Sequence, residues 1–151
     1  MTQVKCDGSR TAIKVVEDAP APLGAYSHAV FAGDFLYVSG QGARKARTGK
    51  EAGVVLDHHG LVVAYDIKVQ TRAVLENLKT VLKAAALELT DLVDVSVFLK
   101  NMDDFAQYNE VYNEYFSFPD PPARTTVQVA GLPGNNFIEI KAIAYRGSSR
   151  S

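Results

Sequence analysis

The feature that most constrains the fold of this chain is a long helical pattern at residues 66–87. One side of the pattern recurs at three- and four-residue spacing, which is the period of an α-helix. This side consists of Ile67, Thr71, Val74, Leu78, Val81, Leu82 and Ala85. Asp66 stands where an N-cap or first-turn acid is expected. Because a helix with one apolar side must bury it, the rest of the chain has to supply a packing layer.

The residues after this helix predict a half-buried strand and then a second helix. Residues 91–100 alternate between apolar and polar side chains, which is the period of a strand with one face in the core. The predicted inward face carries Val93, Val95, Val97 and Leu99. The second helix spans about 103–116, and its apolar stripe is Phe105, Tyr108, Val111, Tyr112 and Tyr115.

Further strands are predicted on both sides of the helices. They lie at residues 11–16, 26–31, 35–39, 122–129 and 137–144. A turn at Gly33-Asp34 joins the second and third of them as a hairpin. Residues 40–60 form a long polar loop with a short strand at Val54–Leu56.

The element order is therefore β-β-β-α-β-α-β-β. It predicts an α/β (α+β) single domain in which two helices cover one face of a mixed sheet. Two helices cannot cover both faces. The uncovered face needs a partner, so the sequence predicts an oligomer.

Length and composition agree with one small globular domain. The chain has 151 residues, a formal net charge of −1 and a single cysteine, Cys6. These values predict one core, no general attraction to nucleic acid and no internal disulfide. No run is long enough to span a membrane, and the polar first ten residues lack a signal-peptide pattern. We expect a cytoplasmic protein with a flexible arm at 1–10 and a domain at 11–147.

Two charged residues in the C-terminal strands are candidates for chemistry. Arg124 begins a strand after Pro-Pro-Ala, where a fixed guanidinium can hold a carboxylate through two parallel hydrogen bonds. Glu139 lies between two isoleucines, where a carboxylate can position or deprotonate a water. Both have simpler interpretations. Arg124, Thr126 and Gln128 share a side that could face solvent, and Glu139 could pair with Lys141 on an exposed face.

Three other side chains are weaker candidates. Asn109 lies at the edge of the second helix's apolar stripe and needs a hydrogen-bond partner, which could be a loop. Tyr26 and His28 begin a strand after a turn, where a tyrosine can serve packing and a histidine the strand edge. No spacing typical of metal ligands or of a phosphate-binding loop accompanies them.

Six segments carry a family resemblance. They are P-L-G-A-Y-S-H-A at 22–29, V-S-G-Q at 38–41, Q-T-R-A-V-L-E-N-L at 70–78, D-F-A-Q-Y-N-E-V-Y at 104–112, P-A-R-T-T-V at 122–127 and I-E-I-K-A-I-A at 138–144. In order and spacing they resemble the RidA/YjgF family of enamine and imine deaminases. The resemblance covers about residues 19–146.

The resemblance implies a chorismate-mutase-like fold and a homotrimer with clefts between its subunits. Arg124 would bind the substrate carboxylate, and Glu139 would orient the hydrolytic water. The positions that would line the cleft are Tyr26, Ser39, Gly40 and Asn109. Family members often have cysteine where this chain has Thr126, so a backbone contact could persist there but a thiol role could not. The resemblance implies no metal and no cofactor.

Two departures from the general family pattern point to a subgroup. The turn after Gly40 is extended through residues 42–60, and His28 replaces a common glutamine. These features resemble the 2-aminomuconate deaminases of bacterial aromatic-compound catabolism, whose substrate carries a second carboxylate. Arg44 could bind it, or the loop's basic residues could simply be solvated.

The leading hypothesis from the sequence is a 2-aminomuconate deaminase, a cofactor-independent hydrolase of C–N bonds that releases 4-oxalocrotonate and ammonia. The first alternative is a general 2-iminopropanoate/2-aminoacrylate deaminase. The second is a non-catalytic trimer that binds small acids. Hydrolysis of an imine next to a carboxylate needs only positioning and modest acid–base help, typically about 10²–10⁴-fold.

Overall fold

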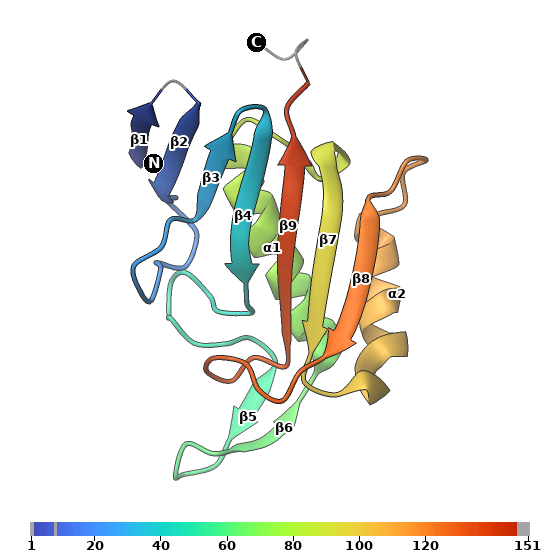
Figure 1. The fold of residues 1–151 in the computed structure, drawn as a ribbon. Helices are drawn as coiled ribbons and strands as arrows, with labels where there is room; N and C mark the ends of the chain where they lie inside the picture. Colours follow the sequence, from blue (N-terminus) through green and yellow to red (C-terminus); the bar gives the residue numbers. More distant parts are fainter. Residues whose placement is uncertain (1, 8, 148–151) are drawn as a thin grey trace.

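The computed structural model describes residues 2–7 and 9–147, which form a mixed α+β fold (Figure 1). Its strands are β1 (Thr2–Asp7), β2 (Arg10–Val15), β3 (Ala29–Ala32), β4 (Phe35–Gln41), β5 (Val54–Leu56), β6 (Val62–Tyr65), β7 (Leu92–Leu99), β8 (Ala123–Gln128) and β9 (Ile138–Tyr145). Seven of them form one sheet in the order β1-β2-β3-β4-β9-β7-β8, and β5 pairs with β6. Only β7 and β8 are parallel within the described sheets.

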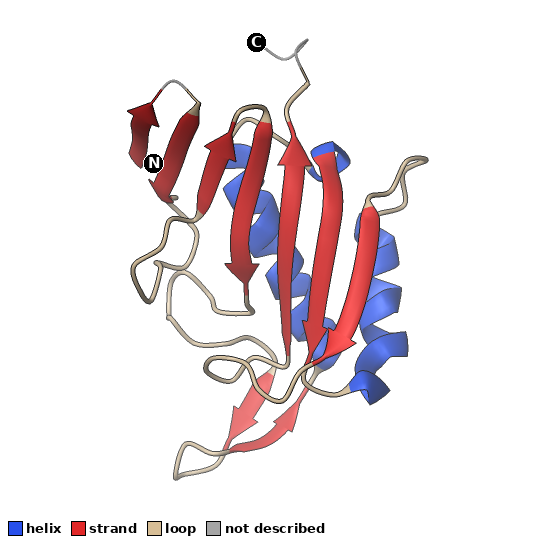
Figure 2. Cartoon of the chain, viewed as in Figure 1, coloured by secondary structure: helices blue, strands red, loops and turns tan. Residues whose placement is uncertain are grey.

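Helix α1 (Ile67–Ala84) and helix α2 (Phe105–Tyr115) both lie behind the large sheet, so one sheet face is covered and the other is open (Figure 2). Both helices follow the predicted positions. The Asp66 side chain caps α1 by accepting hydrogen bonds from the N–H groups of Lys68 and Val69. Short 3-10 turns precede β7 and α2, at Leu89–Asp91 and Met102–Asp104. No helix among the described residues has the length and apolar character needed to cross a membrane.

The core fills the space between the helices and the sheet. Alternate residues of β9 enter it, and these are Ile138, Ile140, Ala142 and Ala144. Val95, Val97 and Leu99 of β7 do the same, as predicted. Val93 does not, since 41% of it is exposed and the register of β7 against β9 shifts between Leu92 and Asp94. The predicted inward position of Val93 is wrong because a bulge resets the alternation there.

The N-terminal residues differ from the expected loose arm. The backbone of Thr2–Asp7 forms β1, antiparallel to β2. Pairing at the edge of the sheet satisfies backbone groups of both strands, and the polar sequence of residues 1–10 gave no periodic sign of it.

The β5–β6 hairpin extends from the end of the large sheet where β9 begins (Figure 1). Tyr65 anchors it: its ring stacks on Phe137 with centroids 3.7 Å apart, and its hydroxyl donates to Asp104 at 2.7 Å. Burial and the neighbouring Asp104 raise the pKa of Tyr65 to about 12, so this donor stays protonated.

Candidate functional site

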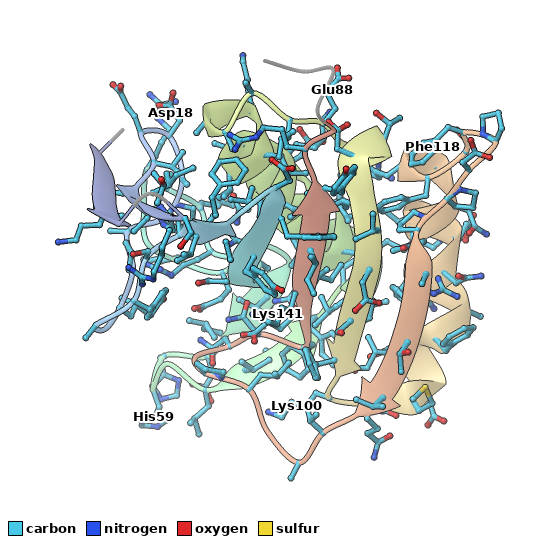
Figure 3. The ribbon with its side chains drawn as sticks, turned by 45° about the horizontal axis from the view of Figure 1, so that its top comes forward. Asp18, His59, Glu88, Lys100, Phe118 and Lys141 are labelled. Atoms are coloured by element: carbon cyan, nitrogen blue, oxygen red, sulfur yellow. The ribbon has the colours of Figure 1, made fainter. Side chains whose placement is uncertain are left out.

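Glu139 lies half-buried on the open face of the sheet. Its neighbours along β9, Ile138 and Ile140, point into the core, and its partner on β7 is Phe98. Lys141 stands two residues after Glu139 on β9 and therefore points to the same face. Figure 3 labels Lys141 on this open side of the sheet. No cation among the described residues forms a salt bridge with Glu139, so the alternative of a Glu139–Lys141 ion pair is not found.

A bulge in β4 makes room for the Glu139 carboxylate. Val38 pairs with Ala142 and Gln41 with Ile140, so β4 has one more residue than β9 between these two pairs. The bulge contains Gly40. A Cβ at Gly40 would lie 2.5 Å from Oε2 of Glu139. The missing side chain therefore lets the carboxylate lie directly over the backbone of β4.

The surroundings of Glu139 favour its protonated form. Burial raises the pKa of the Glu139 carboxyl above its ordinary value, and the charge of Lys141 only partly opposes this. A carboxylate with a raised pKa is a stronger proton acceptor. Glu139 is thus better suited than an exposed carboxylate to take a proton from a water molecule.

Glu139 lines a pocket of about 310 Å³, which we call the glutamate pocket. Four other predicted site residues line the same pocket, namely Tyr26, His28, Gly40 and Arg44. Its remaining wall consists of Pro20, Leu23, Gln41, Gly42, Asn77, Pro133 and Asn136. Ser39 lies outside it, in a more open groove that shares Tyr26, and the Ser39 hydroxyl donates to the carbonyl of Ser27 at 2.6 Å.

Two asparagines that the sequence analysis did not select hold the wall of the glutamate pocket. Asn77 of α1 donates from Nδ2 to the carbonyls of Gly42 at 3.0 Å and Arg44 at 2.9 Å. Asn136 accepts from the N–H of Ala43 at 2.7 Å through Oδ1. Asn77 stands in one of the family segments, next to the buried Leu78, and an amide at such a position has to find partners.

His28 does not offer a ring nitrogen to a ligand. Nδ1 accepts from the N–H of Val16 at 2.8 Å, and Nε2 lies 2.7 Å from the carbonyl of Pro20. Since a carbonyl only accepts, Nε2 carries the proton. His28 therefore ties the chain on both sides of residues 17–19 together. Its ring still lines the glutamate pocket, so a part for His28 in substrate binding stays a prediction.

Arg44 keeps hydrogen-bonding capacity inside the pocket. Its Nη2 donates to the carbonyl of Ala21 at 2.6 Å. Within the described part of the chain no carboxylate forms a salt bridge with it. A guanidinium has five N–H donors, so Arg44 can still bind an anionic group. Tyr26 can also bind a ligand, because 48% of it is exposed and its hydroxyl accepts from the N–H of Leu23 without using its own proton.

Arg124 lies in a second cluster, under α2. Its partner on β7 is Val95, which is fully buried, so Arg124 points to the helix-covered face and not to solvent. Nη1 donates to Oδ1 of Asn109 at 2.7 Å. Cζ lies 4.6 Å from the ring centroid of Tyr112, with the rings of Tyr108 at 5.5 Å and Phe105 at 5.7 Å. Aromatic faces attract a cation at these distances.

We call this cluster the arginine cradle; it comprises Phe105, Tyr108, Asn109, Tyr112, Arg124 and Thr126. None of the salt bridges among the described residues involves Arg124. The cradle thus fixes a half-buried positive charge without a carboxylate beside it. Carboxylates bind arginine in a bidentate manner, so the cradle can serve as a carboxylate site.

The arginine cradle and the glutamate pocket lie on opposite faces of the sheet. Phe98, the partner of Glu139, and Val95, the partner of Arg124, stand an odd number of positions apart on β7. Successive strand residues point to opposite faces, so the sheet separates the two clusters within one chain. A single chain does not bring Arg124, Asn109 and Thr126 next to Glu139.

Comparison with known proteins places the chain in a family. The family model described as Endoribonuclease L-PSP matches residues 16–146. The chain belongs to this RidA/YjgF family. A RutC family protein of Pyrococcus horikoshii is 48% identical over 130 residues, which cover 86% of this chain and 94% of that protein. A protein of Salmonella typhimurium named 2-iminobutanoate/2-iminopropanoate deaminase is 39% identical, with 86% and 94% covered.

Solved structures of RidA/YjgF proteins share the fold. The YjgF gene product of E. coli superposes with a TM-score of 0.77 at 36% identity, over 90% of this chain and 98% of that one. E. coli TdcF, described with bound serine, gives a TM-score of 0.75 at 35% identity, over 89% and 99% of the two chains. The predicted fold, a mixed sheet with two helices on one face, is therefore confirmed.

Proposed function

We propose that this protein hydrolyses small 2-imino acids, and their 2-amino-enoate tautomers, to 2-oxo acids and ammonia. The observation that carries the proposal is the arginine cradle, a fixed cation without a carboxylate partner among the described residues. It suits the carboxylate that all these compounds share. The deaminase name of the Salmonella typhimurium relative supports the same reaction class.

The proposed reaction uses groups that the chain supplies. Arg124 holds the substrate carboxylate and so fixes the imine carbon beside a water at Glu139. The water oxygen bonds to the imine carbon while Glu139 accepts a water proton, and the C=N electron pair moves to nitrogen, which takes a proton from solvent; the product is a carbinolamine. Glu139 then returns its proton to the amine nitrogen. The C–N bond breaks as the carbinolamine hydroxyl releases its proton to solvent, so ammonia leaves and a 2-oxo acid remains. Positioning and proton transfer of this kind are the usual sources of modest rate enhancement.

We further propose that neighbouring copies in a homotrimer complete each site. Arg124 and Glu139 face opposite sides of the sheet in one chain, so two copies would supply them to one cleft. The open sheet face also carries large exposed side chains, namely Phe35, Tyr37, Val127 and Tyr145. A second copy packed there would remove this apolar surface from water.

The test is to generate 2-aminoacrylate enzymatically and to follow its ultraviolet decay and ammonia release with the purified protein. We expect catalysed hydrolysis, and light scattering should give the mass of a trimer. Absence of turnover together with saturable binding of small acids would instead support a non-catalytic acid-binding protein.

A narrower candidate is deamination of 2-aminomuconate, which the Arg44 position favours. Arg44 lies in the glutamate pocket, and within the described part of the chain only its Nη2 donates a hydrogen bond, so a second carboxylate could bind there. In this case Arg44→Ala should weaken turnover of 2-aminomuconate much more than that of 2-aminoacrylate. Arg47→Ala, an exposed change in the same loop, should affect neither. Equal effects of Arg44→Ala on both substrates would remove the second-carboxylate idea.

A further inference from the structure

The arginine cradle contains a pair of hydroxyl groups beside the guanidinium. Oη of Tyr108 and Oγ1 of Thr126 lie 2.7 Å apart. Tyr108 is fully buried on α2, whereas Thr126 is half-buried on β8. Thr126 stands two residues after Arg124, so both side chains lie on the same face of the strand. The pair therefore borders the place where a carboxylate held by Arg124 would lie.

The direction of this hydrogen bond follows from burial. The Tyr108 hydroxyl makes no other hydrogen bond in the part of the chain that the structure describes. If Thr126 donated, the Tyr108 proton would be buried without an acceptor, which is costly. Tyr108 therefore donates and Thr126 accepts. Burial also raises the pKa of Tyr108, so the phenol stays protonated.

The Thr126 proton is then left for another acceptor. A threonine hydroxyl has one proton and two lone pairs, and Tyr108 occupies one lone pair. Thr126 makes no further side-chain hydrogen bond within the described residues. Side chains two positions apart on a strand are separated by about 6.5 Å, a span that one bound carboxylate can bridge. An anion at Arg124 could thus accept from Thr126 as well.

We propose that Tyr108 is a positioning residue for substrate binding: by donating to Thr126, it directs the Thr126 proton toward the carboxylate held by Arg124. This inference rests on the proposed function only in taking a carboxylate as the ligand of Arg124. Tyr108 itself does not touch the substrate. Its hydroxyl acts through Thr126. Because it occupies one lone pair of the Thr126 oxygen, it excludes one of the orientations that the Thr126 O–H bond would otherwise adopt.

Tyr112 shows that an aromatic residue of α2 can pack against Arg124 without using its hydroxyl group. Tyr112 lies one turn after Tyr108 on α2 and is 5% exposed, yet its buried hydroxyl has no hydrogen-bond partner among residues 2–7 and 9–147. Its ring provides the contact with Arg124. A phenylalanine could supply such a contact equally well. The Tyr108 hydroxyl differs because it has a partner, and this partner borders the carboxylate site.

The test is a double-mutant cycle with Tyr108→Phe, Thr126→Val and the double variant, measured as KM for 2-aminoacrylate and as Kd for pyruvate. We expect Thr126→Val to raise both about tenfold, the loss of one hydrogen bond to a charged group. Tyr108→Phe should raise both about threefold, with kcat nearly unchanged, because ground-state binding is weakened. Tyr108→Phe should add nothing in the Thr126→Val background.

The matched control is Tyr115→Phe, which also removes a tyrosine hydroxyl from α2 and one hydrogen bond of 2.7 Å, here to Glu76. It should leave KM and Kd unchanged. The double variant buries no hydroxyl without a partner, so its melting temperature should recover toward that of the wild type. Its KM and Kd should stay raised. If Tyr108 had a purely structural role, KM and Kd would instead recover together with the melting temperature.

Two results would overturn the inference. One is a Tyr108→Phe protein with the wild-type Kd for pyruvate. The other is additive effects of Tyr108→Phe and Thr126→Val on Kd. Because pyruvate binding is measured independently of turnover, a wild-type protein that fails to hydrolyse 2-aminoacrylate would contradict the proposed reaction while the cycle still decides the role of Tyr108.

Discussion

The arginine cradle and the glutamate pocket hold their key residues by different means. In the cradle, side chains from one helix hold a side chain: Asn109 and Tyr112 of α2 contact Arg124 of β8. In the pocket, side chains hold main chain: Asn77 and Asn136 bind the backbone of residues 42–44. The cradle is thus fixed by two regular elements, whereas the pocket depends on a loop that a few hydrogen bonds keep in place.

This difference matches the two parts of the proposed substrates. All 2-imino acids share the carboxylate, which would meet the rigid cradle. Their side chains vary, and these would meet the loop-built pocket with Arg44. If the proposed function holds, we expect changes of loop residues to alter the substrate, because surface loops tolerate substitution and insertion better than packed elements do.

The strongest test inactivates the arginine cradle in one copy of the chain and the glutamate pocket in another copy. Arg124→Ala and Glu139→Gln should each lower kcat/KM about 10²–10⁴-fold, the range expected for losing a carboxylate clamp or an acid–base group. If the two regions meet between copies, refolding the two variants together should recover about a quarter of the wild-type rate, since random mixing gives one intact site in four.

A matched control for Arg124→Ala is Arg72→Ala. Arg72 also stacks on a tyrosine of α2, with Cζ 5.9 Å from the Tyr115 ring, but it pairs with Glu114 at the surface. We expect Arg72→Ala to keep full activity and the wild-type mass in light scattering. Mixed variants that stay as inactive as either one alone would show that the regions work within a single chain or not at all.

A smaller effect should follow from filling the space under Glu139. Gly40→Ala places a Cβ 2.5 Å from Oε2 of Glu139, so the carboxylate must move. We expect a loss of about 10²-fold in kcat/KM, which is the scale for misplacing a catalytic group by about 1 Å. Pyruvate binding at the cradle should be retained. Gly131→Ala, where a Cβ meets nothing within 4 Å, is the control and should remain active.

The sequence predicted which residues belong to the two regions better than it predicted how the two regions face each other. Alternation correctly placed Arg124 and Thr126 on one side of their strand. It could not tell which side meets a helix, because that depends on the pairing of Arg124 with Val95 across β7 and β8. For the same reason the opposite faces of Arg124 and Glu139 were not foreseen. Periodicity describes one strand, whereas relative facing is a property of pairing between strands.

The loop-built region was the least predictable part. Val54–Leu56 was predicted as a strand and is β5, but its partner Val62–Tyr65 was not. His28 binds two backbone groups, the N–H of Val16 and the carbonyl of Pro20, which lie 12 and 8 residues away in the sequence. Such contacts leave no periodic trace in the sequence, since they arise only when loops pack together.

The pH dependence separates the two regions further. The pKa of Glu139 is raised in the folded protein by burial, so kcat/KM should fall on the acid side with a midpoint above the ordinary 4.5 of a glutamate. Pyruvate binding at Arg124 should not follow this midpoint. A midpoint at or below 4.5 would contradict the assigned role of Glu139.

The same shift predicts a gain in stability for Glu139→Gln. A carboxyl with a raised folded pKa contributes stability that is present at low pH and lost as the pH rises through that pKa. Glutamine carries no charge and avoids this loss. The variant should therefore melt above the wild type at neutral pH, and the difference should shrink below pH 4.5. Scanning calorimetry at several pH values measures it, and a variant less stable than the wild type at neutral pH would refute the argument.

The smallest expected effect concerns the loop that the pocket depends on. Asn77→Ala removes two hydrogen bonds, to the carbonyls of Gly42 and Arg44, and should cost about 1–3 kcal/mol of unfolding free energy. For a chain of this size that lowers the melting temperature by about 2–12 °C. Asn113→Ala, an exposed change on α2, should not lower it. Since Asn77 holds only the loop, KM for 2-aminoacrylate should rise while pyruvate binding at the cradle stays the same. An equal loss in both measurements would mean that the loop and the cradle are one cooperative unit, and that the contrast between them is one of architecture alone.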